Sequence, residues 1–298
     1  MLAFALQVVF VAGGLIYCWM LFHAFSKQRR DGQLVPSTSV AKVGAVGALA
    51  NFLDTLGVGS FAIKTAFYKQ FKLVDDRLLP GTLNGQCVLP TVAQALLFIG
   101  AVDVDPVTLI GMMAAAALGA CIGAKWVSGL DRQLVRLIMC IALLIVAALI
   151  FAGLLGWFPV GGDAMGLGGT KLAIALAGNF IFGALMSVGV GLYAPCMTLV
   201  YLLGMNPIAA FPIMMGSCAV LSFFSAGTFI RNGAFDAKAV LAVAIAGPVA
   251  VVLAATLVKS MDVEMLKWLV AFVVLYTSAS MYRSWQQSRP PAAAHASQ

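Results

Sequence analysis

The stretch NFLDTLGVGSFAIK, residues 51–64, places polar side chains inside a long apolar segment. Asn51, Asp54, Thr55 and Lys64 surround a break at Gly57-Val58-Gly59. A charge at the centre of a bilayer costs about 2.5–3.5 kcal/mol on insertion scales. Either the segment lies outside the membrane or these groups have a function within it, and the rest of the chain decides between the two.

The chain has the composition of a polytopic membrane protein. Of its 298 residues, 62% are apolar and 10% are charged, whereas a soluble domain has about 25% charged residues. The net charge of +7 then indicates membrane topology, because basic residues gather on the cytoplasmic side, and it does not indicate nucleic-acid binding. No cysteine pair has the spacing of a zinc site, and we expect neither a metal nor a cofactor.

Seven segments are apolar and long enough to cross a bilayer, which takes about 20 residues. They are residues 2–25, 79–101, 106–128, 133–156, 207–230, 238–258 and 262–282. Two further stretches, 43–71 and 171–204, are interrupted by glycines. If each of them enters the membrane, turns and returns, all but Lys171, Lys259 and Lys267 of the 18 basic residues fall on the cytoplasmic side.

The sequence therefore predicts an all-α polytopic membrane protein with seven transmembrane helices plus two re-entrant helical hairpins. The N-terminus is expected outside and the C-terminus in the cytoplasm.

Two pairs of motifs align at one constant offset, which indicates an internal repeat. LGVGSFA at 56–62 aligns with VGVGLYA at 188–194, and LPGTLNGQCVL at 79–89 aligns with FPIMMGSCAVL at 211–221. Each copy contains a hairpin and three crossings, an odd number, so the second copy has inverted topology. The expected regions are an N-terminal transmembrane helix with a basic cytoplasmic loop, repeat 1, its inverted copy and a disordered cytoplasmic tail, at 1–42, 43–156, 171–282 and 283–298.

The two hairpin tips are expected to form an anion site near the midplane. A turn at Gly-Val-Gly leaves backbone N–H groups at the start of the next helix, and such an N-terminus attracts anions. Broken helices that meet at a repeat interface form the site of many secondary transporters. The expected substrate-binding residues are Asn51, Thr55, Gly57, Val58, Gly59, Ser60, Lys64, Ser187, Gly189, Val190, Gly191 and Tyr193.

Asp54 is the only acidic residue deep within the apolar segments, and we expect it to bind the coupling ion, a proton or sodium. Lys64 either pairs with Asp54, binds the anion or extends to the cytoplasmic surface. Further polar side chains in the next helix and its repeat partner either line the cavity or form interhelical hydrogen bonds. They are Thr82, Asn84, Gln86, Gln94 and Ser217.

The two glycine-rich hairpins, each followed by a proline-bearing polar helix, resemble the sulfite exporter TauE/SafE family of bacterial permeases. The motifs are DTLGVGSFAIKT with LLPGTLNGQCVLPTVAQ, and GALMSVGVGLYAPCMTLVYLLGMNP with FPIMMGSC, within roughly residues 40–282. The resemblance implies an inner-membrane exporter of sulfite, sulfonates or related organosulfur and organic anions, driven by an ion gradient. Its partners are then the anion, the coupling ion and the lipid bilayer.

Two alternatives stay open at this point. A membrane thiol-redox carrier would use cysteines at equivalent positions of the two copies, whereas Cys196 aligns with Lys64. An anion channel could be lined by re-entrant loops as well. No GxSxG, HExxH or paired intramembrane aspartates indicate an enzyme, and the sequence does not predict an oligomeric state.

Overall fold

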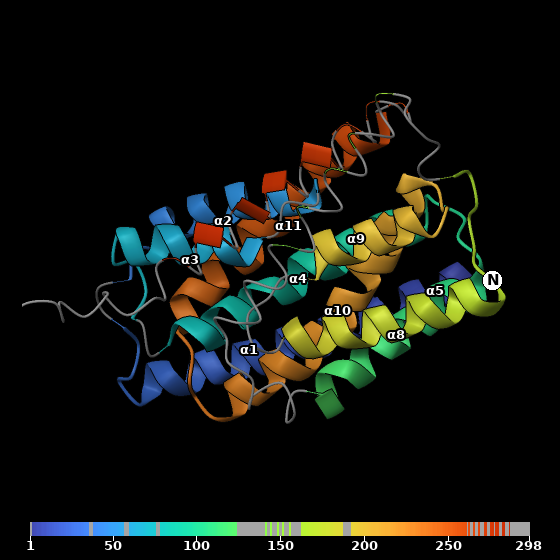
Figure 1. The fold of residues 1–298 in the computed structure, drawn as a ribbon. Coiled ribbons are helices and arrows are strands. Elements are labelled where there is room, and N and C mark those ends of the chain that lie inside the picture. Colours follow the sequence, from blue (N-terminus) through green and yellow to red (C-terminus); the bar gives the residue numbers. More distant parts are fainter. Residues whose placement is uncertain are drawn as a thin grey trace, which may run out of the picture.

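The computed structural model describes residues 2–35, 38–56, 60–75, 78–123, 162–186 and 192–260, with single positions in 141–155 and 262–286. All the elements in these ranges are helices (Figure 1). In chain order they are α1 (Leu2–Arg30), α2 (Val40–Thr55), α3 (Ser60–Gln70), α4 (Leu79–Ile99), α5 (Pro106–Leu118), the π-helical turn η1 (Gly119–Gly123), α8 (Gly169–Met186), α9 (Tyr193–Leu202), the 3-10 turn η2 (Pro207–Ala209), α10 (Ala210–Arg231) and α11 (Ala237–Ser260).

Four helices in the described ranges are long and apolar enough to cross a membrane, namely α1, α4, α10 and α11. Helices α5 and α8 are apolar but shorter. The chain is therefore a multi-pass, all-helical membrane protein, as the sequence predicts. The expected crossings at 133–156 and 262–282 fall largely outside the described residues, so the count of seven stays a prediction.

The chain reverses direction between α2 and α3. Lys64 of α3 donates a hydrogen bond back to Asn51 of α2, with 3.3 Å between Nζ and Oδ1. Helices α8 and α9 also pack against each other, and Gly178 of α8 faces the side chain of Leu199 in α9. Figure 1 shows α3 beside α2. That these pairs enter a bilayer and return remains a prediction.

The helices form two sets, α2 to α5 and α8 to α11, and helices of one set pack against helices of the other. Helix α2 lies against α11, α8 lies against α5, and α4 and α10 contact each other between the two pairs (Figure 1). At that central contact the rings of Phe98 and Phe211 stack with centroids 5.2 Å apart. The pair α2 and α3 thus packs through α2 against α11 of the other set, and the pair α8 and α9 packs through α8 against α5.

Two aspartates show that the sets run in opposite directions. Asp105 accepts a hydrogen bond from the backbone N–H of Thr108 at 2.8 Å, and Thr108 holds the segment before α8 through the N–H of Leu167 at 2.9 Å. Asp236 precedes α11 and accepts a hydrogen bond from Thr38, just before α2. Because α2 begins beside Asp236 and α8 begins beside Asp105, the two pairs start from opposite ends of the molecule, as in an inverted repeat.

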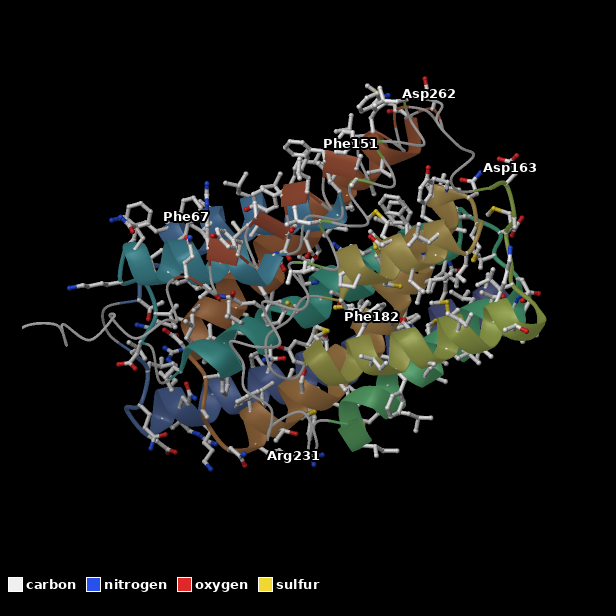
Figure 2. The ribbon with its side chains drawn as sticks, in the orientation of Figure 1. Phe67, Phe151, Asp163, Phe182, Arg231 and Asp262 are labelled. Carbon is white, nitrogen blue, oxygen red and sulfur yellow. The ribbon has the colours of Figure 1, made fainter. Side chains whose placement is uncertain are left out.

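Charge separates along the same axis. Helix α1 ends on Lys27, Arg29 and Arg30, and at that end Lys238 donates to the backbone oxygen of Val35 at 2.9 Å. Figure 2 shows Asp163 and Asp262 toward the side of the view where α1 begins, and Arg231 away from them. Because basic residues favour the cytoplasmic side, this separation supports the proposed orientation.

Accessibility of two exposed positions tests that orientation. Gln70 ends α3 and Ala101 follows α4, and both are exposed. In a background in which the exposed thiols Cys18 and Cys121 are replaced by serine, an impermeant maleimide should label Gln70→Cys only from the cytoplasmic face and Ala101→Cys only from the opposite face. Labelling of Gln70→Cys from outside would mean that α2 and α3 together cross the membrane.

Candidate functional site

Asp54 is the last acidic group before the turn of the first helical pair, and its carboxylate caps the helix that follows. Oδ1 accepts a hydrogen bond from the backbone N–H of Ser60, the first residue of α3, at 2.6 Å. The first turn of a helix has unpaired N–H groups and the positive end of the helix dipole, so a carboxylate is stabilised there. The sequence predicts that N–H groups at this helix start bind an anion, and in the structure Asp54 accepts the hydrogen bond of one of them, the N–H of Ser60.

Gln94 of α4 connects the two helical pairs. Its Nε2 donates to Asp54 Oδ2 at 3.1 Å and to Thr55 Oγ1 at 2.9 Å. Its Oε1 accepts from the hydroxyl of Tyr193, the first residue of α9, at 2.6 Å. All four side chains are buried. Since an amide nitrogen only donates, both oxygens of Asp54 act as acceptors.

Lys64 is fully buried beside this network. Its ammonium donates to Asn51 Oδ1 at 3.3 Å, and the amide of Asn51 is held in turn by the backbone oxygen of Gly47 at 2.8 Å. The alternative in which Lys64 extends to the cytoplasmic surface is therefore wrong. Asn51, rather than Asp54, is the hydrogen-bond partner of Lys64, although the charges of Lys64 and Asp54 are close enough to attract each other.

Two of the polar residues of α4 contact the other set of helices. Thr82 Oγ1 accepts from the backbone N–H of Asp236 at 2.9 Å, and Gln86 Nε2 donates to the backbone oxygen of Ala239 at 3.0 Å. Asn84 is half-buried. Of the two roles considered from the sequence, interhelical hydrogen bonding is therefore the one observed for Thr82 and Gln86.

Asn179 of α8 was not identified from the sequence. Its Nδ2 donates to the backbone oxygen of Met112 at 2.7 Å and to Ser217 Oγ at 3.1 Å, so Ser217 also takes part in an interhelical bond. Asn179 Oδ1 and Thr198 Oγ1, on the two helices of the second pair, are buried without a hydrogen-bond partner in the described part of the chain. An asparagine in an apolar helix is the signal that could have found this position.

Several predicted binding residues lie outside the described residues, and the structure does not place them. They are Gly57, Val58, Gly59, Ser187, Gly189, Val190 and Gly191. The residues on either side of these segments are described, and Gln94 links the end of α2 to the start of α9. The predicted meeting of the two Gly-Val-Gly tips stays a prediction.

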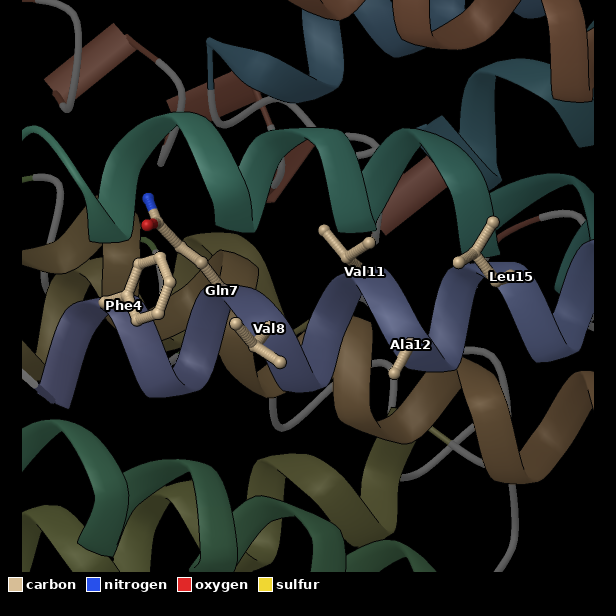
Figure 3. A pocket seen from close by; sticks show the side chains of 6 residues that line it. All are labelled: Phe4, Gln7, Val8, Val11, Ala12 and Leu15. Atoms are coloured by element: carbon tan, nitrogen blue, oxygen red, sulfur yellow. The ribbon is translucent and has the colours of Figure 1, made fainter.

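A surface depression of about 310 Å³ lies along α1, away from this network (Figure 3). It is lined by Phe4, Gln7, Val8, Val11, Ala12 and Leu15. Its one polar side chain, Gln7, donates to the backbone oxygen of Leu96 at 3.2 Å. The depression offers no charge to a small anion, so the network around Asp54, Lys64 and Gln94 is the candidate site.

Residues 171–298 match the family model of the sulfite exporter TauE/SafE. The TauE/SafE match begins within α8 and includes α9, α10 and α11, and thus confirms the resemblance for the second set of helices. The resemblance of residues 40–170 to TauE/SafE remains a prediction. No curated protein and no solved structure matches the chain.

Replacing Gln94 should destabilise the protein through the network. Gln94→Leu leaves Asp54 Oδ2 and the Tyr193 hydroxyl buried without this partner, which costs about 1–3 kcal/mol per group. The apparent melting temperature in detergent should fall, whereas Gln7→Leu, the same change at the half-buried Gln7, should change it much less.

A double-mutant cycle separates the Gln94–Tyr193 bond from general packing effects. Tyr193→Phe and Gln94→Leu remove the same hydrogen bond, so their effects on stability should be less than additive. If the stability losses of the two single variants simply add up in the double variant, the hydrogen bond between Gln94 and Tyr193 is not formed in the protein.

Proposed function

We propose that this chain is a secondary transporter that exports a small anion. The proposed substrate is sulfite, a sulfonate or a related organosulfur or organic anion. The observation that carries the proposal is Lys64, a fully buried ammonium at the point where the two helical pairs are linked. The TauE/SafE match supports the same class of protein. In this proposal the chain lies in the bacterial inner membrane with its N-terminus outside.

The chemistry of Lys64 favours an anion as the ligand. An ammonium has three hydrogen-bond donors, and Asn51 accepts one of them. Ionisable groups inside a membrane are costly and mark substrate or ion pathways by default. A small oxyanion can accept the remaining donors of Lys64 and benefit from the dipole of α3, whose first turn contains Ser60 and Lys64.

The position of the site suits alternating access. In this proposal the tips at Gly57–Gly59 and Gly189–Gly191 meet at the midplane, where glycine lets the backbone approach the ligand closely. Rocking of one helical set against the other would then expose the site to each side in turn. In this proposal Tyr193 donates a hydrogen bond to the anion when it is not donating to Gln94. Asp54 binds the coupling ion, a proton or sodium.

Transport by proteoliposomes tests the proposal. Reconstituted protein should take up one class of a panel of sulfite, sulfate, thiosulfate, methanesulfonate, sulfoacetate, taurine and small carboxylates, with a saturable rate. Saturation and dependence on an ion gradient would exclude a channel. Absence of uptake and of binding for every anion of the panel by folded protein would overturn the proposal.

A substitution at Lys64 tests its role as the anion ligand. Lys64→Met should raise the half-saturating concentration about 10–100-fold, because a hydrogen bond to a charged group contributes about 1.5–3 kcal/mol. Lys42→Met, the same change at an exposed lysine on α2, is the matched control and should leave transport within about twofold of the wild type. Lys64→Arg should restore part of the activity, and wild-type transport by a folded Lys64→Met variant would rule out the role.

A further inference from the structure

The candidate site already contains an anion of its own. The Asp54 carboxylate accepts from the backbone N–H of Ser60 at 2.6 Å, at the positive end of α3, and the charge of Lys64 attracts it. The first turn of α3 and Lys64 are the same groups to which a substrate anion would bind. In the empty site, therefore, Asp54 occupies partners that the substrate needs.

We propose that Asp54 competes with the substrate for these partners, and that the anion displaces its carboxylate only together with one proton, which Asp54 takes up. The inference rests on the proposed function and deepens it, because it makes the proton the coupling ion. Anion and proton then travel in the same direction, so export is driven by the outward gradient of the anion, and an inward proton gradient opposes it. The proton adds to a carboxylate oxygen of Asp54, and no other bond forms or breaks.

Charge balance requires this stoichiometry. With Lys64 positive and Asp54 negative, the buried site is neutral when empty. A monovalent anion entering alone would leave a net negative charge in a desolvated site, and the effective penalty for such a charge is several kcal/mol. Protonation of Asp54 restores neutrality, because the substrate then becomes the partner of Lys64.

The surroundings of Asp54 favour a proton over sodium. Hard cations need a shell of oxygen ligands. The two carboxylate oxygens instead accept from the N–H of Ser60 and the amide of Gln94, and the one described oxygen group that also bonds to the carboxylate is the Ser60 hydroxyl. Sodium would have to displace both donors, whereas a proton needs only one oxygen.

Asp54 is also the group of the site that can accept a proton. The described ionisable groups that act on it are Lys64 on α3, Cys87 on α4, Tyr193 on α9 and Cys218 on α10. An ammonium has no lone pair that could take up a proton, and a thiol or a phenol already carries one. The carboxylate is the one member of this set that has a proton to gain.

Displacement of Asp54 would reach the second helical pair through Gln94. The amide that donates to Asp54 is held at its other end by Tyr193. When the carboxylate moves or becomes protonated, this chain of hydrogen bonds has to rearrange. Occupancy of the site would in this way be communicated from α2 and α3 to α9.

Calorimetry with an anion of fixed charge tests the inference. The probe is methanesulfonate or sulfate, whichever the full-length protein binds more tightly, because both keep their charge between pH 5 and 8. Titrations in two buffers of different ionisation enthalpy count the protons taken up. For methanesulfonate we expect about one proton per anion and an affinity that falls up to about tenfold for each unit of pH increase, as linkage requires.

Asp54→Asn should abolish this coupling while keeping binding. The neutral amide imitates the protonated carboxyl, so affinity should become independent of pH and proton uptake should disappear. Asp105→Asn, a change of the same kind at a helix cap far from the site, is the matched control and should retain the proton uptake of the wild type.

The outcomes separate this inference from the proposed function. If the wild type binds the probe without proton uptake and with an affinity independent of pH, or if binding requires sodium, the inference is overturned and the anion transporter stands. If neither probe nor any other anion of the panel binds, the proposed function fails and the inference fails with it. The wild-type measurement decides even if the Asp54→Asn variant does not fold.

Discussion

Two opposite charges within the apolar interior constrain the remainder of the site. Asp54 and Lys64 are both buried, and neither can be removed from water without partners at an acceptable free energy. Ser60, Gln94 and Asn51 supply these partners. The turn of the first pair, the position of α4 between the two pairs and the polar groups along α4 together keep these contacts in register.

The packing of each set against the other explains how a polar centre is tolerated in a helical membrane protein. Because α2 lies on α11 and α8 lies on α5, one helix of each pair is covered by a helix of the opposite set. Non-helical backbone at membrane depth is stable only where protein or a water-filled cavity surrounds it. The aspartates at the starts of α5 and α11 also contact the segments that lead into the helical pairs. The backbone N–H of Asp105 donates to the backbone oxygen of Met165 at 2.8 Å, and Asp236 accepts from Thr38.

The apolar helices, the reversal after Thr55 and the position of Asp54 within the apolar interior could be predicted from the sequence, because hydropathy and an unexpected charge are local signals. The partners of Gln94 could not. They lie 40 and 99 residues away along the chain, and the choice among several polar residues of α4 depends on how that helix is rotated between the two pairs. The same holds for Lys64, where only the packed structure distinguishes a bond to Asn51 from an extended side chain.

The hydrogen bond between Gln94 and Tyr193, which links the two pairs, also has a characteristic timescale of opening and closing. A buried hydrogen bond of this kind contributes about 0.5–1.5 kcal/mol, which is at most about three times the thermal energy. Such a contact opens and closes far faster than packed helices move past one another, a motion of microseconds to milliseconds. In the proposed alternating-access cycle, the bond would therefore bias which arrangement of the two sets is populated, whereas the rate of exchange would depend on the repacking of α4 against α10.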